Sequence, residues 1–471
     1  MDISCTLPDM KIQKIGGGQK VVESEDRISQ LSDSLLHHIL SFLPTKNAVA
    51  TCILSTRWQD LWISVTNLDF ECSNYYKKEF KFSNGFMNFV EKVLLLHSSN
   101  IKMFRLKHCG VVDSFRLSSW IYAAVRRHVH ELHLSFRMET VLMLPRCLCT
   151  SKTLTVLKIE HARCHLQFAS TTCFSSLRTL HLCDVTLVDD LSIHRLFSGL
   201  LVLEELKLCR CGWWNVKRAI ISIPTLRNLT IDVFCPGLKD ECQIKVNTEN
   251  LKYVSCTSDL TIDLVLDNLS SSVETHINFE SSWSHPKVRS YAENLFRVIC
   301  FAKTLKICDA TLEGIHCSFM ENLDLLPTFV NLTSLEVKAR VMSDTSRVLM
   351  GILSNSPVLE DVFIKEVCAG KLVRNPLPQG LNSCLKSCCL QCFDGRPAEM
   401  SFVTILLENA TTLERMKIHC SQYLTGEVKM LKDVTKQLEM VTRASESCVI
   451  ELLKHGGPKT EKIMLQVESH V

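Results

Sequence analysis

Long hydrophobic runs are missing from this sequence of 471 residues. No apolar stretch approaches the ~20 residues that a membrane-spanning helix requires, and the first twenty residues lack the apolar core of a secretion signal. We therefore expect no membrane partner and an intracellular protein, in the nucleus, the cytoplasm or both. In such a compartment the 24 cysteines are expected to be reduced thiols, which pack as small apolar side chains.

A marked excess of positive or negative charge is also lacking. The chain has 53 Lys and Arg residues against 50 Asp and Glu residues, which gives a net charge of +3, and it contains no dense basic run. Proteins that bind nucleic acids or anionic membranes usually present a clear excess of positive charge. The balance predicts no nucleic-acid partner.

Signatures of catalysis are absent as well. No local motif indicates a Ser-His-Asp or Cys-His nucleophile. Residues 16–20, which read Gly-Gly-Gly-Gln-Lys, lack the spacing of a phosphate-binding loop, the Ser or Thr after its lysine, and a preceding strand. We expect no catalytic residue and no cofactor.

One cysteine cluster is a metal candidate. Cys389 and Cys392 have the local spacing of zinc ligands, and Cys384 and Cys388 lie nearby. However, Cys388 occupies an apolar position of a predicted strand, and the alternation of side chains then turns Cys389 to the opposite face. We expect no metal site here.

A repeat is present through most of the chain. The pattern Leu-x-x-Leu-x-Leu recurs every 23 to 28 residues in two series, inside the ~20–29 residues of a leucine-rich repeat. The middle positions are Phe104, Leu132, Leu157, Leu180, Leu206, Leu229 and Val254, and then Leu335, Val362, Cys388 and Met416. Val273, Ile277 and Phe279 predict one imperfect strand between the two series. The sequence therefore predicts an α/β solenoid with a parallel sheet on one face and helices and loops on the other.

Local features of the repeats fit this fold. Cys109 and Cys211 occupy the Asn/Cys position, where a small buried group closes the turn. Helices are expected at residues 86–94, 190–199 and 343–354. Trp213 and Trp214 follow the Cys211 turn. Adjacent side chains of an extended segment point to opposite sides, so we expect one tryptophan in the core and the other exposed, as a weak candidate for contacting a target.

Residues 26–70 predict three short helices. In the first, Leu35, Leu36, Ile39, Leu40 and Leu43 share one face. Ser32 is expected to cap this helix with its side chain, and Pro44 to end it. Thr45, and Ser55 or Thr56, are expected to cap the other two. So much apolar surface on so few residues cannot all be buried internally. Since the repeat array should supply its own core, we expect the surplus face to bind another protein.

This stretch resembles the F-box of plant F-box proteins. The similarity is continuous, and a Leu-Ser dipeptide replaces the usual Leu-Pro. The matching pieces are Asp26-Arg27-Ile28-Ser29, residues 35–44, Leu54-Ser55-Thr56-Arg57-Trp58 and Leu61-Trp62, with Leu31-Ser32 as the altered dipeptide.

The C-terminal part is similar to the FBD domain that follows leucine-rich repeats in many of these proteins. The matching pieces are Leu377-Pro378, Phe393-Asp394-Gly395, residues 406–410, Leu413-Glu414 and residues 443–448. The resemblance implies five segments. These are a flexible segment (1–24), an F-box (25–70), irregular leucine-rich repeats (71–370), an FBD domain (371–455) and a C-terminal tail (456–471).

The resemblance also implies a function. F-box proteins of this kind are substrate receptors of Skp–cullin–F-box E3 ubiquitin ligases, without catalytic activity of their own. The F-box binds a Skp-family adaptor and through it cullin, and the repeats bind a target protein for ubiquitination. The implied adaptor-binding residues are Leu31, Ser32, Leu35, Leu36, Ile39, Leu40, Leu43, Pro44, Val49 and Trp58, some of which must pack internally.

Two other interpretations stay open. The chain could be a repeat scaffold that binds a protein without recruiting a ligase, since Ser32 could weaken the F-box. It could also be a metal or redox protein built on the cysteines at 384–392. The repeat pattern does not identify the target, because the exposed residues of a repeat can vary freely while its apolar positions are kept.

Overall fold

The computed structural model describes residues 28, 30–72, 84–137, 141–160, 164–167, 173–233, 242–258, 262–267, 273–279, 294, 296, 299–319, 326–341, 343–367, 384–454 and 462–465. The expected flexible segment 1–24 lies outside these residues. So do residues 26, 27, 29, 377 and 378 of the motifs quoted above.

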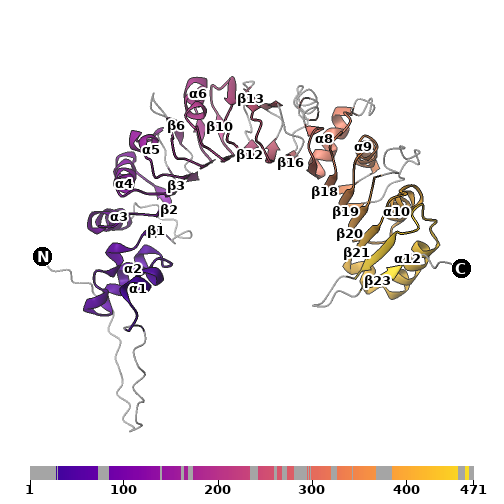
Figure 1. Ribbon diagram of the computed structural model, residues 1–471, viewed down its shortest axis with the longest axis horizontal. Coiled ribbons are helices and arrows are strands. Elements are labelled where there is room, and N and C mark those ends of the chain that lie inside the picture. Colours follow the sequence, from indigo (N-terminus) through magenta and orange to yellow (C-terminus); the bar gives the residue numbers. More distant parts are fainter. Residues whose placement is uncertain are drawn as a thin grey trace, which may run out of the picture.

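One large arched sheet organises the protein (Figure 1). In the described part of the chain it has 16 strands, and all neighbours pair in parallel except the last two, β22 and β23. The strands line the concave side of the arch and the helices lie on its convex side. The predicted α/β solenoid is confirmed.

The strands follow one another along the arch in chain order. They are β1 (Asn67–Glu71), β2 (Met103–Val111), β3 (Glu131–Arg137), β5 (Val156–Glu160), β7 (Thr179–Cys183), β9 (Glu205–Cys209), β12 (Asn228–Val233), β14 (Tyr253–Ser258), β16 (Glu274–Phe279), β17 (Thr304–Cys308), β18 (Ser334–Val341), β19 (Asp361–Val367), β20 (Ser387–Phe393), β21 (Arg415–Cys420), β22 (Val449–Leu453) and β23 (Lys462–Leu465). The expected imperfect strand at 273–279 is β16. The expected C-terminal tail contains β23.

Helices and two small sheets cover the convex side. The helices are α3 (Asn84–Leu96), α4 (Ser114–Arg126), α5 (Arg146–Thr150), α6 (Asp190–Ser198), α8 (Asp309–Phe319), α9 (Ser343–Ser354), α10 (Pro397–Asn409), α11 (Gln422–Gly426) and α12 (Val428–Met440). One small sheet contains β4 (Val141–Met143), β6 (His165–Gln167), β8 (Thr186–Leu187) and β10 (Gly212–Trp213). The other contains β11 (Arg218–Ile221), β13 (Cys242–Asn247) and β15 (Ile262–Asp267). The helices predicted at 86–94, 190–199 and 343–354 are α3, α6 and α9.

A single row of buried side chains runs in register through the whole sheet. It contains Leu68, Phe104, Leu132, Leu157, Leu180, Leu206, Leu229, Val254, Thr275, Leu305, Leu335, Val362, Cys388, Met416 and Ile450. Every member is at most 3% exposed. Because successive side chains of a strand point to opposite faces, this row fixes which residues face the core and which face the concave surface. The predicted repeat positions are thus confirmed as structural equivalents.

Cys211 closes its turn as predicted. It is 1% exposed, and its thiol donates a hydrogen bond of 3.3 Å to the carbonyl oxygen of Leu182. The side chain of Cys109 lies outside the described residues.

The N-terminal module, residues 30–66, contains two α-helices followed by short 3₁₀ turns. The helices are α1 (Asp33–Leu40) and α2 (Thr45–Ala50), and the turns are η1 (Thr51–Ile53), η2 (Thr56–Trp58) and η3 (Leu61–Ser64). The third predicted helix is therefore a series of 3₁₀ turns. These turns still bury the aromatic rings of Trp58 and Trp62.

The predicted side-chain caps of this module are wrong. Ser32 occupies the N-cap position of α1, but its hydroxyl pairs with that of Ser34 at 2.9 Å and caps no backbone N–H. Pro44, and not Thr45, is the N-cap of α2, and Ser55 caps η2 without a side-chain hydrogen bond. α1 ends at Leu40, four residues before Pro44, so the helix ends earlier than the proline predicts.

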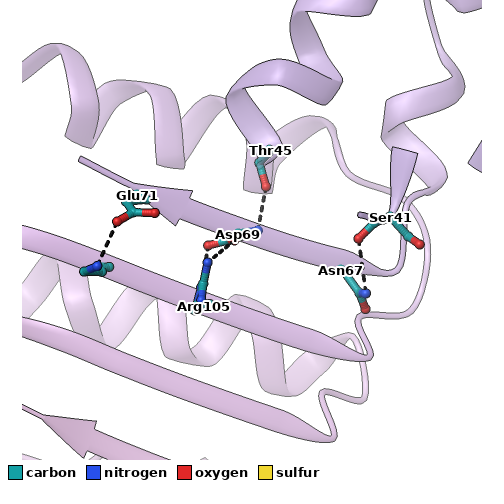
Figure 2. Close-up of polar contacts among 7 residues, drawn as sticks. Ser41, Thr45, Asn67, Asp69, Glu71 and Arg105 are labelled. Carbon is teal, nitrogen blue, oxygen red and sulfur yellow. Dashed lines mark hydrogen bonds and ion pairs between the residues drawn. The ribbon is translucent and has the colours of Figure 1, made fainter. Parts of the chain in front are cut away.

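The freed Thr45 side chain joins the module to the sheet (Figure 2). Its hydroxyl accepts a hydrogen bond of 2.6 Å from the backbone N–H of Asp69 in β1. The Asn67 amide donates to the Ser41 carbonyl oxygen at 3.4 Å. The Asp69 carboxylate in turn accepts hydrogen bonds from the Nε and one Nη of Arg105 in β2. These bonds raise the pKa of Arg105. The first strand of the arch is therefore bound on one side by the module and on the other by β2.

Candidate functional site

An apolar stripe lies exposed on α1 and the turn after it. Leu35, Ile39 and Phe42 are 50%, 44% and 75% exposed. Their spacing of four and three residues places them on one side of the helix, and we call them the exposed stripe. Large apolar side chains gathered on a helix face commonly mark a protein-binding site. The exposed stripe is thus the candidate docking surface of the module.

The adjacent face of α1 holds the module together. Leu36 and Leu40 are 0% exposed and Trp58 is 7% exposed, and all three belong to the core cluster. Leu31, Leu43 and Val49 are partly buried against that cluster. The structure thereby divides the predicted adaptor-binding residues into three groups. Leu35 and Ile39, with Ser32 and Pro44, are exposed to solvent, whereas the buried ones support the fold and the partly buried ones lie between.

Arg57 fixes the beginning of α1. Its guanidinium donates to the carbonyl oxygen of Leu31 and pairs with the Asp33 carboxylate at 2.7 Å. Sequence reasoning placed Arg57 in the family motif but gave it no role. The contact explains why this motif lies at that distance from the helix. It sets the direction in which α1 presents the exposed stripe.

Three exposed apolar residues were missed by the sequence analysis. Phe42 continues the exposed stripe, and Ile53 and Leu54 are 84% and 62% exposed. The spacing Leu35, Ile39, Phe42 was a signal that could have found Phe42, because positions i, i+4 and i+7 share a face. Ile53 and Leu54 had no such signal, since Ile53 ends the 3₁₀ turn η1 and Leu54 follows it, and the geometry of such turns is not visible in a periodicity of 3.6 residues.

The concave face of the arch is a second candidate surface. The register brings basic or imidazole side chains of five adjacent strands into one row, formed by Arg105, His133, Lys158, His181 and Lys207. His181 bonds Glu205 at 2.8 Å, yet burial lowers its pKa and that of His133. Both imidazoles are therefore neutral at pH 7. A face with mixed charge and polar groups suits the recognition of a protein more than of a uniformly charged polymer.

The two tryptophans divide as the sequence predicts. Trp213 in β10 is 1% exposed and belongs to the core, whereas the next residue, Trp214, is 59% exposed. Trp214 is therefore the one that can contact a target. Its backbone N–H donates to the Leu187 carbonyl oxygen at 2.9 Å, which holds this residue against β8.

The cysteines at 384–392 do not converge. Cys388 is 0% exposed in the core row, Cys389 lies on the other face of β20, and Cys392 is exposed at a positive φ of 52°. In the residues that the structure describes, no group of three or more His, Cys, Asp or Glu side chains is arranged to hold a metal ion. Among the described helices, none has the length and hydrophobicity to cross a membrane.

The C-terminal motifs build one compact turn. Phe393 ends β20 in the core, Asp394 accepts a hydrogen bond from Ser421, and Gly395 adopts a φ of 74° close to Val434. A Cβ at Gly395 would meet the Val434 Cγ2 at 2.5 Å, so both the conformation and the space require glycine. Further on, Arg443 donates to the carbonyl oxygens of Cys448 and Leu465 at 2.9 and 3.2 Å. These described motif residues thus shape the end of the arch.

Three family models match the chain. The F-box domain matches residues 28–69. A model described as the LRR repeats of the FBD-associated F-box protein At5g56370 matches residues 117–265, and the FBD model matches residues 375–418. The matches follow one another in the order of the N-terminal module, the arch and its C-terminal end.

Similar proteins of Arabidopsis thaliana cover most of the chain. F-box/LRR-repeat protein At4g14096 is 30% identical over 91% of this chain and 95% of its own length. F-box/FBD/LRR-repeat protein At4g00160 is 31% identical over 91% of this chain and 94% of its own length. F-box/LRR-repeat protein At4g14103 is 32% identical over 73% of this chain and 92% of its own length.

Proposed function

Because this chain belongs to the plant family of F-box/FBD/LRR-repeat proteins, we propose that it is a non-catalytic substrate-recognition subunit of a Skp–cullin–F-box E3 ubiquitin ligase. The F-box (residues 25–70) binds a Skp-family adaptor and through it cullin. The repeats (71–370), extended by the FBD domain (371–455), bind a target protein. These partners place the protein in the nucleus or the cytoplasm.

The exposed stripe is the observation on which adaptor binding rests. Leu35, Ile39 and Phe42 present their side chains to solvent although the same helix buries Leu36 and Leu40 completely. A helix that is apolar on both faces and covered on only one has a face left for a partner. Ser32 lies at the N-terminal end of this stripe and is also exposed, so its hydroxyl can meet the adaptor directly.

The link between the F-box and the sheet supports a positioning role. Thr45, Asp69 and Arg105 connect α2, β1 and β2 through side-chain hydrogen bonds. The orientation of the exposed stripe relative to the concave face is thereby fixed by the fold. A fixed separation raises the effective concentration of a bound target near the ubiquitin donor. No covalent step by this chain is needed.

Adaptor binding can be tested with surface variants of the full chain. Leu35→Ala combined with Ile39→Ala removes apolar surface without opening the core, and we expect a loss of about 2 kcal/mol or more in affinity, which is roughly 30-fold. Leu95→Ala with Leu96→Ala is the matched control, because these leucines of α3 are 81% and 55% exposed. Titration calorimetry with a purified Skp-family adaptor measures both. Equal affinities for the two double variants would remove the exposed stripe from the interface.

A repeat scaffold that recruits no ligase is the second candidate, because Ser32 stands where the F-box pattern has proline. Capture of the wild-type chain from plant extract, followed by detection of cullin, separates the two functions. Cullin in the wild-type capture and its loss with Leu35→Ala/Ile39→Ala support the ligase. A wild-type chain that binds neither adaptor nor cullin supports the scaffold.

A further inference from the structure

Two thiols lie side by side on neighbouring strands of the arch. Cys183 ends β7, Cys209 ends β9, and the two residues are direct partners in the parallel register. Adjacent strands are about 4.8 Å apart, within the roughly 4.4–6.8 Å between Cα atoms that a disulfide spans. The fold thus brings together two cysteines that are 26 positions apart in the sequence.

This pair lies on the concave face. The preceding residues, Leu182 and Leu208, are 0% exposed in the core, so the alternation of the strands turns Cys183 and Cys209 the other way. Each cysteine is 8% exposed. This exposure distinguishes the pair from Cys388, which is fully buried in the core row.

An ion pair holds the two strand ends in place directly after the cysteines. Arg210 donates its Nε and one Nη to the two carboxylate oxygens of Asp184 at 2.8 and 2.7 Å. Asp184 and Arg210 both have a positive φ, 56° and 48°, so each strand turns at the residue that follows its cysteine. The bidentate contact keeps the register of Cys183 and Cys209 fixed.

The surroundings assign different chemistry to the two thiols. Cys209 lies between Lys207 and Arg210 in the chain, whereas Cys183 is followed directly by Asp184. The two positive charges lower the pKa of Cys209, while burial and Asp232 act in the opposite direction. Because positive charge stabilises the thiolate, which is the nucleophile, Cys209 is suited to react first and Cys183 to react second.

We propose that Cys183 and Cys209 form a reversible dithiol–disulfide pair on the concave face, oxidised by hydrogen peroxide. The Cys209 thiolate attacks one peroxide oxygen, the O–O bond breaks, and the leaving hydroxide takes up a proton to become water. Cys183 then attacks the sulfur of the resulting sulfenic acid, the S–S bond forms, and a second water leaves. Two thiols have lost two protons and two electrons, and one peroxide has become two waters.

The bond would be easy to reverse. Direct partners in a sheet must draw their Cβ atoms to about 3.5–4.5 Å to close a disulfide, and a strained bond is reduced more readily. A thiol reductant therefore restores the open pair. Oxidation would cross-link β7 to β9 in the middle of the concave surface. This inference does not depend on the proposed ligase role.

Trypsin offers a clean readout on the full chain. It places Cys183 in peptide 179–195, Cys209 in peptide 208–210 and Cys211 in peptide 211–217. The protein is treated with hydrogen peroxide until the exposed Cys173 is modified, then alkylated, digested without reductant and analysed by mass spectrometry. We expect the linked species 179–195/208–210, and its disappearance after dithiothreitol.

Variants separate this pair from general thiol oxidation. Cys183→Ser is expected to abolish the linked species and to leave a sulfenic acid on Cys209 that dimedone traps, whereas Cys173→Ser is expected to leave the link intact. If the serine variant fails to fold, Cys183→Ala with the same trapping replaces it. The proposal is overturned if Cys183 and Cys209 both remain free to alkylation while Cys173 is oxidised. A link from Cys183 to peptide 211–217 in place of 208–210 overturns it equally.

Discussion

Glu399 is a buried carboxyl group at the C-terminal end of the arch. It lies in the first turn of α10, is 2% exposed, and accepts backbone N–H groups of Asp394 and Arg396 at 3.0 and 2.8 Å. Burial is the largest effect on this group and raises its pKa from 4.5 to about 7, although the two hydrogen bonds act in the opposite direction. One side chain thus links the turn after β20 to the start of the next helix, at the cost of a carboxyl group that is hard to ionise.

This pKa predicts a pH dependence of stability. The folded state holds the Glu399 proton up to about pH 7, whereas the unfolded chain releases it near 4.5. The stabilisation is therefore present below about pH 4.5 and is lost as the pH rises through about 7. Glu399→Gln keeps an acceptor oxygen and removes the titration, so the Tm of the variant minus that of the wild type should increase between pH 5 and about 7.

The difference between the two chains is the quantity to measure, by differential scanning calorimetry over this pH range. Histidines with lowered pKa values, such as His97 and His419, change stability in the opposite direction, but both chains contain them. A Tm difference that does not change with pH would show that Glu399 is already ionised in the folded protein.

At the level of the element, the repeat strands show what a sequence pattern can and cannot reveal. The Leu-x-x-Leu-x-Leu pattern located eleven strands of the arch, because buried apolar residues at fixed spacing leave a clear signal. It passed over β1, β17 and β22, whose central residues are Leu68, Leu305 and Ile450. These strands follow or precede irregular segments, so no constant step leads to them.

The docking site, like the strands, could be predicted from the sequence only in part. The helical period of residues 35–43 identified α1 and its apolar residues, but Leu35 and Leu36 are neighbours in sequence and lie on different faces. Only the position of Trp58 and the sheet decides which of them is covered. The module and the array are also joined, since Leu36, Trp58 and Phe104 belong to one core cluster.

Thr275 is a polar residue in the apolar row and should weaken β16. It is 0% exposed, and its hydroxyl has no hydrogen-bond partner among the described residues. Thr275→Val keeps the shape of the side chain and removes the unpaired hydroxyl, so we expect the free energy of unfolding to rise by about 1–2 kcal/mol. Urea denaturation followed by circular dichroism measures the change.

Thr311 is the matched control for this prediction. It is equally buried, but its hydroxyl donates to the Ile277 carbonyl oxygen at 3.0 Å, so Thr311→Val should lower the free energy of unfolding by about 1 kcal/mol. Thr275 lies in β16 and Thr311 in the first turn of α8. Opposite signs for the two substitutions, one of an unpaired and one of a paired hydroxyl, test the hydrogen-bond argument. Destabilisation by Thr275→Val would mean that its hydroxyl is satisfied in solution.

On the scale of the whole molecule, the N-terminal module closes one end of an open sheet. β1 follows directly on the 3₁₀ turns, pairs with β2 on one edge, and is packed beside α2 at the end of the arch. His97, just after α3, donates a hydrogen bond of 2.8 Å from its Nε2 to the Val65 carbonyl oxygen. The exposed end of a repeat stack needs such a cap, so the module serves the fold as well as a partner.

Trp58 distinguishes these two roles of the module. Its ring is 7% exposed, and Trp58→Ala should cost about 3–5 kcal/mol through the lost contacts and the cavity left behind. Because repeat proteins are stabilised mainly between neighbouring units, the loss should be felt at the N-terminal end. Hydrogen exchange measured by mass spectrometry should show faster exchange in residues 33–71 and in β2, with β20 to β22 unchanged. Leu35→Ala/Ile39→Ala should leave all of these rates as in the wild type while weakening adaptor binding. If Trp58→Ala accelerates exchange only within residues 33–64 and spares β1 and β2, the module folds independently of the arch, and its orientation toward the concave face is not fixed by the shared core.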